Sequence, residues 1–146
     1  MKKLLLLAAI AAVFYYLNRG PAPPLPDAGL QSPPSVATDA LEAAYAEQRS
    51  DVQVTGAGRV TRILGDDSIG DRHQRFILEL PSGQTVLIAH NIDLAPRVEP
   101  LAAGDPVEFH GVYEWNDKGG VVHWTHHDPE GQHEPGWLKH GGRTYE

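Results

Sequence analysis

The chain has 146 residues, with 12 Lys or Arg against 19 Asp or Glu, and its formal net charge is -7. This length suits one compact domain with accessory segments, and an apolar fraction of 41% is enough for a small core. The acidic balance argues against binding to a polyanion by charge alone. Cysteine is absent, which excludes disulfides and a thiol nucleophile, whereas eight histidines are unusual in so short a chain.

Residues 1–19 predict a targeting segment. Lys2 and Lys3 carry positive charge, and an unbroken apolar run follows from Leu4 to Leu17. The run is shorter than the roughly 18 residues of a spanning helix, as in a signal peptide. No clean cleavage site follows, so the segment is either a signal peptide or a retained anchor in the inner membrane. Both alternatives place the rest of the chain in the periplasm or outside the cell.

Residues 20–37 are rich in proline and predict an extended linker. We expect the folded domain over residues 38–146. Thr38 is in position to cap a short helix over about residues 39–49. Leu41 would lie on the helix face that packs against the domain.

Alternating apolar and polar residues from position 52 onward predict five short β-strands. The first runs from Val52 to Ile63, and Gly56 and Gly58 mark the place where a barrel strand would bend. The others are expected at residues 76–80, 85–90, 107–115 and 120–125. This pattern predicts a mainly β fold, a small five-stranded OB-like barrel, because a β-sandwich would need about seven strands. The tail after residue 128 is expected to be irregular.

Two predicted hairpins bring polar residues together. A two-residue turn at residues 82–83 would pair Arg75 with His90, so that residues 72–75 lie beside residues 89–93. In the last hairpin, pairing of Trp115 with Gly120 would carry its second strand on to His126. The core face of that hairpin is then expected to carry Val107, Phe109, Tyr113, Val122 and Trp124, and its outer face Glu108, His110, His123 and Thr125.

Residues 123–133 contain four histidines and Asp128 within eleven positions. Imidazole and carboxylate bind divalent transition metals, and imidazole transfers protons near neutral pH. An alternative reading is structural, because an Asp directly before Pro129 also fits an Asx turn.

Three segments, at residues 72–80, 89–97 and 124–129, resemble a family of short exported bacterial proteins catalogued as a domain of unknown function (family 3465). The resemblance covers roughly residues 40–146. It implies a shared fold and a shared site, without an established activity.

Residues 92–96 are also similar to the strand-then-Asp-x-Pro stretch of the staphylococcal-type nucleases, which are OB barrels. In that family the Asp binds a metal, a Glu just after the Pro assists the attacking water, and two arginines hold the phosphate. Asp93 matches the family's Asp. However, Arg97 stands in place of the Glu, an extra residue precedes Pro96, and the family's Asp-Gly-Asp is absent. A nuclease of this kind would need a histidine as its general base.

These residues together favour an exported phosphodiesterase, such as a nuclease, that uses Mg²⁺, Mn²⁺, Ca²⁺ or Zn²⁺. The candidate catalytic residues are His90, His126, His127, Arg72 and Arg75; the candidate substrate contacts are His73, Asn91, Arg97 and Trp124; and the candidate metal ligands are Asp93, Asp128 and His123. Two alternatives stay open: a non-catalytic OB-fold module for an oligonucleotide or oligosaccharide, and a periplasmic metal-binding protein.

Overall fold

The computed structural model describes residues 38–146 of the chain. The predicted targeting segment and linker at residues 1–37 lie outside the described residues. Among the described residues, no helix is long and apolar enough to cross a membrane. The elements are α2 (Asp39–Ala46), β1 (Val52–Ile63), β2 (His73–Glu79), β3 (Thr85–Asn91), β4 (Pro106–Glu114), β5 (Val121–His123), β6 (Trp137–His140) and β7 (Arg143–Tyr145).

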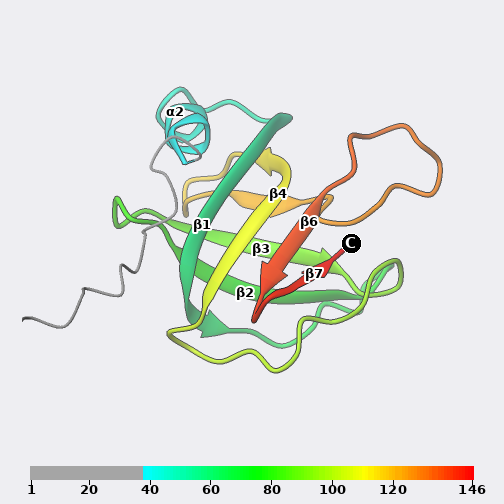
Figure 1. Ribbon diagram of the computed structural model, residues 1–146. Helices are drawn as coiled ribbons and strands as arrows, with labels where there is room; N and C mark the ends of the chain where they lie inside the picture. The colour runs from blue at the N-terminus through cyan, green and yellow to red at the C-terminus, as the bar shows by residue number, and fades with distance from the viewer. Residues whose placement is uncertain (1–37) are drawn as a thin grey trace, which may run out of the picture. The chain divides into compact units, whose positions relative to one another are not determined.

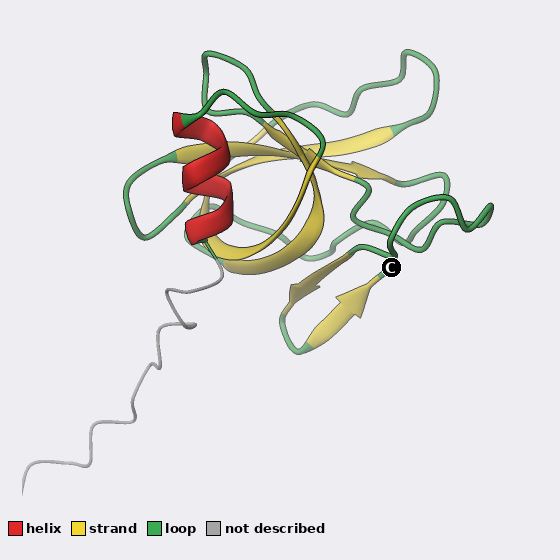
Figure 2. Cartoon of the chain, turned by 90° about the horizontal axis from the view of Figure 1, so that it is seen from above, coloured by secondary structure: helices red, strands yellow, loops and turns green. Residues whose placement is uncertain are grey.

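Five strands close into a barrel in the order β1-β2-β3-β5-β4, and β4 pairs with β1 to complete the circle (Figure 1). All of these pairings are antiparallel except that between β3 and β5. The predicted mainly β fold with a five-stranded OB-like barrel is therefore confirmed. Short α2 lies beside the barrel, as Figure 2 shows, and it buries Leu41 and Ala44 completely.

The bend in β1 comes from its two glycines, as the sequence predicts. β1 pairs with β4 through its first part and with β2 through its second part, so the strand passes from one side of the barrel to the other. A Cβ on Gly56 would lie 2.5 Å from Cζ of Phe109, and one on Gly58 would lie 2.6 Å from the Glu79 carbonyl oxygen. Only glycine permits these close approaches.

Alternate residues of the strands fill the core. Phe76, Leu78 and Ile88 are completely buried on β2 and β3, whereas their neighbours along the same strands face outward. On β4 and β5 the predicted core residues Val107, Phe109, Tyr113 and Val122 are likewise buried. The expectation that Trp124 belongs to the core is wrong, because this residue is half-buried outside the core cluster.

The predicted register of the first hairpin is wrong by one residue. Gln74 lies opposite His90, because the loop has three residues rather than two. The Gly83 amide donates to the Leu80 carbonyl, and Gly83 has a φ of 88°. A third loop residue in this left-handed region is typical of a bulged hairpin. The polar segments 72–75 and 89–93 still lie side by side.

The register of the last hairpin is confirmed, since Tyr113 lies opposite Val122. Its second strand, however, ends at His123 rather than at Thr125, because Trp124 has a φ of 53° and turns the chain away. His126 therefore does not pair with Phe109. The partner of Phe109 is Leu138, which β6 supplies along the edge of β4 that β5 has left.

The tail is not irregular throughout, contrary to expectation. Residues 137–145 form the hairpin of β6 and β7, which extends the sheet beyond the barrel. Gly141 and Gly142 connect the two strands with φ angles of 56° and 77°. Two consecutive positive φ angles are those of a type I′ turn, for which Gly-Gly is a favoured sequence.

Candidate functional site

The predicted site residues gather at one end of the barrel, which we call the polar end. β3 and β5 run parallel and finish there, and β2 begins there (Figure 1). The loops at residues 64–72, 92–97 and 124–136 connect to these strand ends. The structure thus brings together the two polar stretches that the sequence placed side by side, together with the histidine-rich segment.

Asp93 and Arg72 form a close ion pair at the polar end. The Arg72 backbone amide donates to one carboxylate oxygen of Asp93 over 2.7 Å, and its Nε donates to the other over 2.8 Å. These hydrogen bonds and the guanidinium charge lower the pKa of Asp93. The predicted metal ligand is thus an anion that already has a cationic partner.

The other two arginines of the polar end also have partners. The Arg97 guanidinium is paired with Asp66 and lies 3.5 Å from Glu99. The Nε of Arg75 donates to the Gly65 carbonyl over 3.0 Å, and Asp67 lies 4.0 Å from its guanidinium. The polar end therefore carries little uncompensated positive charge for a phosphate.

His90 is completely buried, and both of its ring nitrogens have partners. Its Nδ1 lies 2.8 Å from the Thr125 hydroxyl, and its Nε2 lies 3.1 Å from the Pro96 carbonyl oxygen. Because a carbonyl only accepts, Nε2–H is the donor and Nδ1 accepts from Thr125. Burial lowers the pKa of His90 to about 4, which keeps the ring neutral near pH 7. This geometry suits a residue that joins two loops to β3.

Gln74 and Asn91 also serve the backbone at this end. Gln74 is buried, and its amide both donates to the Val98 carbonyl and accepts from the Val98 amide, over 3.0 and 2.9 Å. The predicted substrate contact Asn91 is 6% exposed, and its side-chain oxygen accepts from the Asp93 amide over 2.9 Å. The Asn91 side chain therefore shapes the turn after β3.

Asp128 holds the loop at residues 124–136 in shape. Its carboxylate accepts hydrogen bonds from the backbone amides of Glu130, Gln132 and His133 over 2.7–2.9 Å. These hydrogen bonds lower the pKa of Asp128, and the one from the Glu130 amide has the largest effect. Of the two readings of this residue, the geometry favours the Asx turn over the metal ligand.

Replacing Asp128 by alanine is expected to loosen this loop while the barrel stays folded. Three backbone amides would lose their charged acceptor, so their hydrogen exchange should accelerate by about tenfold or more. Exchange measured by NMR on the amides of Glu130, Gln132 and His133 tests this. The exposed Asp117, in the turn between β4 and β5, gives the matched control Asp117→Ala. Equal exchange in the two variants would contradict the assignment.

Trp124, at the start of this loop, lies near the rings of three histidines. Its ring stacks on that of His133 at 4.0 Å between centroids, and the rings of His126 and His123 lie at 5.4 and 6.3 Å. His126 is nearly buried, with its Nδ1 2.8 Å from the His127 carbonyl oxygen, whereas His127 is exposed. A bulky residue at positive φ is strained, and such strain is often found at functional positions.

A second polar group, on the outer face of β1, β4 and β6, was not among the predicted site residues. His110 lies 2.7 Å from the Thr55 hydroxyl and 3.1 Å from the Glu134 carboxylate. The His110 ring stacks on the Trp137 ring, with 5.8 Å between their centroids. The Lys139 ammonium lies over the same Trp137 ring, 4.2 Å from its centroid. The alternation along β4 placed His110 on the outer face, but only the pairing of β4 with β6 brings Trp137 beside it.

The outer face of β2, β3 and β5 carries a row of aliphatic side chains. Ile77 lies opposite Leu87, and Leu87 lies opposite Val121. All three are half-buried, whereas the residues that alternate with them fill the core. His73 and Arg75 share the outer face with Ile77 on β2, His123 shares it with Val121 on β5, and Glu114 lies opposite Val121 on β4. Among residues 38–146, no three His, Asp or Glu side chains are arranged to hold a metal ion.

The fold and the polar end together define an OB-like barrel domain with a histidine-rich end. The chain belongs to the family described as "Protein of unknown function (DUF3465)", whose model matches residues 26–146. The family resemblance that the sequence motifs indicated is thereby confirmed. The search of curated proteins found no match. Only the barrel supports the similarity to the staphylococcal-type nucleases.

Proposed function

We propose that this chain is a non-catalytic binding module that holds an uncharged oligosaccharide on the outer face of β2, β3 and β5. The observation that carries the proposal is the half-buried row of Ile77, Leu87 and Val121 on that face. OB barrels bind oligonucleotides and oligosaccharides across this side of the barrel. The aliphatic row would contact the C–H surface of a sugar ring, and the polar rim would bond to its hydroxyl groups.

The charges favour a saccharide over a nucleic acid. The formal net charge is -7, and the three arginines of the polar end are paired with Asp93, Asp66 and Asp67. A phosphate backbone would have to displace these carboxylates before it gained any attraction. A neutral sugar requires no such exchange. The predicted export would place the module among the glycans of the cell envelope.

Hydrolysis receives less support from the same geometry. Asp93 and Asp128 are occupied by guanidinium and amide donors, and His90 has no free ring nitrogen. Among the predicted catalytic residues, only His127 is an exposed histidine. Metal-dependent cleavage of DNA or RNA that is lost in His127→Ala would therefore overturn the proposal and restore the nuclease hypothesis.

Leu87→Lys is expected to weaken oligosaccharide binding by about tenfold or more, because it places a charge at the centre of the face. Calorimetric titration with a panel of neutral oligosaccharides, anionic oligosaccharides and single-stranded DNA tests this. Leu94→Lys is the matched control, since Leu94 is 46% exposed on the loop after β3. Binding of DNA in preference to every neutral sugar, or equal loss in both variants, would contradict the proposal.

A further inference from the structure

The Nε2 atom of His123 is buried and has no hydrogen-bond partner among the described residues. The Oε1 atom of Glu114 lies 3.6 Å from it, beyond hydrogen-bond distance. Buried polar side-chain atoms normally have a hydrogen-bond partner, and leaving one without a partner costs free energy. The unpaired nitrogen therefore marks a place where a further polar group would be stabilising.

This nitrogen lies at the border of the aliphatic row that we propose as the contact for a sugar ring. Val121 of that row precedes His123 by two positions on β5, so both side chains are on the outer face. Val121 lies opposite Leu87 on one side and opposite Glu114 on the other. The side chains of His123 and Glu114 are 35% and 43% exposed, so both are accessible from this face, although Nε2 itself is covered. A ring that lies on the row would have its edge beside this His–Glu pair.

One hydroxyl group can bond to both members of the pair. Burial lowers the pKa of His123, which keeps the ring neutral near pH 7 with hydrogen on one of its two nitrogens. With that hydrogen on Nε2, the ring donates to a hydroxyl oxygen, and the hydroxyl donates to the Glu114 carboxylate. Two partners about 2.8 Å from a tetrahedral oxygen lie about 4.6 Å apart. The exposed Glu114 side chain supplies the difference from 3.6 Å by a small rotation.

We propose that His123 and Glu114 together recognise one hydroxyl group of the oligosaccharide and so determine which sugars the face accepts. This inference rests on the proposed function. Polar groups that bond to a ligand hydroxyl discriminate strongly against a ligand that lacks it, because they are then left unpaired. The aliphatic row, in contrast, contacts any C–H surface of suitable shape. The row thus supplies affinity, and the His–Glu pair supplies specificity.

The test is calorimetric titration of the full-length chain with a panel of neutral oligosaccharides that includes cellotetraose, maltotetraose and chitotetraose. For the sugar that binds most tightly, we expect binding weakened about tenfold or more in His123→Phe and in Glu114→Gln. The double variant should lose little more than either single variant, because both residues bond to the same hydroxyl. The differences in affinity among the sugars of the panel should also shrink in each variant.

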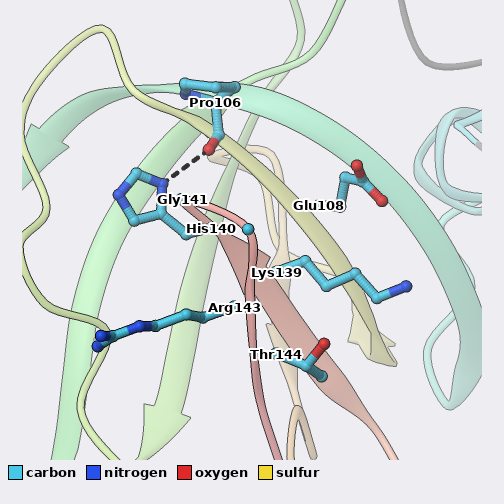
Figure 3. A pocket seen from close by; sticks show the side chains of 8 residues that line it. Pro106, Glu108, Lys139, His140, Gly141, Arg143 and Thr144 are labelled. Atoms are coloured by element: carbon cyan, nitrogen blue, oxygen red, sulfur yellow. Dashed lines mark hydrogen bonds between the residues drawn. The ribbon is translucent and has the colours of Figure 1, made fainter.

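Glu108→Gln is the matched control, because Glu108 is an exposed acid on the same strand as Glu114. Glu108 lines a different hollow, an open cavity of about 440 Å³ beside the hairpin of β6 and β7 (Figure 3). The exposed side chains of Lys139 and Arg143 point in opposite directions there, so they do not converge on one ligand group. Glu108→Gln should therefore bind each sugar like the unmodified chain.

The possible results separate this inference from the proposed function. If Leu87→Lys weakens binding but His123→Phe and Glu114→Gln do not, the role of the pair is overturned and the proposed function stands. Equal loss in Glu108→Gln also overturns the role of the pair. If no neutral sugar of the panel binds, both proposals fall. Without sugar, the melting temperature of His123→Phe should not fall, because the variant removes an unpaired buried nitrogen, and this measurement separates loss of binding from loss of folding.

Discussion

Gly136→Ala is expected to destabilise the domain by about 4 kcal/mol or more, which is exceptional for the addition of one methyl group. The new Cβ would lie 1.8 Å from the Trp124 carbonyl oxygen and 2.7 Å from that of His110. Both obstacles are backbone atoms, so no side-chain rotation relieves the clash. Gly136 also donates its amide to the His126 carbonyl over 3.0 Å, which closes the loop at residues 124–136. Chemical denaturation with far-UV circular dichroism measures the loss.

Gly65→Ala is the control for this prediction. Gly65 lies in the loop before β2, and a Cβ on it would have nothing within 4 Å. Its replacement should change stability by no more than about 0.5 kcal/mol, or raise it slightly by restricting the unfolded chain. If Gly136→Ala were tolerated as well as Gly65→Ala, the close packing of Gly136 against the backbone at Trp124 would be disproved.

Acid is expected to weaken the fold between about pH 6.5 and pH 4 through His90. Burial lowers the pKa of His90 to about 4, whereas the pKa of the same ring in the unfolded chain is near its ordinary value of 6.5. In that interval the unfolded chain binds a proton that the folded chain excludes, so stability falls as the pH falls. The difference corresponds to about 3 kcal/mol at its full extent. Urea denaturation at several pH values measures it.

His90→Leu should be less stable than the unmodified chain at pH 7, and its stability should depend less on pH. At pH 7 the variant loses about 2–4 kcal/mol, because the Thr125 hydroxyl and the Pro96 carbonyl are left buried without their partner. Between pH 6.5 and pH 4 its stability should fall less steeply than that of the unmodified chain. Part of the slope remains, since burial also lowers the pKa of His123. The lowered pKa values of Asp93 and Asp128 act in a separate, more acidic range.

The exposed His127 supplies the control for the pH experiment. His127→Ala should keep the full slope between pH 6.5 and pH 4, because the side chain of that residue is exposed. A His90→Leu variant with the same slope as the unmodified chain would show that His90 does not cause the acid sensitivity.

Local sequence was enough to predict the barrel strands. A strand's side chains alternate between two faces, so Val107, Phe109 and Tyr113 could be assigned to the core before the structure was known. Gly56 and Gly58 likewise predicted the bend in β1, because a residue without Cβ is needed where another strand comes close. The β6–β7 hairpin was missed, although the glycine pair at residues 141–142 was a usable turn signal.

The candidate site was predicted only in part. The sequence indicated which segments meet at the polar end, but not what each side chain does there. His90 and Asn91 were assigned to the chemistry of the site, whereas the structure uses them to hold the chain in place. The one-residue error at the first hairpin arose because loop length depends on Gly83 adopting a positive φ, which the strand pattern does not report.

By itself, the sequence determined the class of fold, because hydrophobic alternation and glycine positions act over a few neighbouring residues. Only the tertiary structure decided which polar groups are free. Asp128 is occupied by three amides of its own loop, whereas the buried Nε2 of His123 faces Glu114 across β4 and β5 without a hydrogen bond. The physical reason is that a polar side chain bonds to whatever the fold brings within about 3 Å of it, and those partners come from distant parts of the chain.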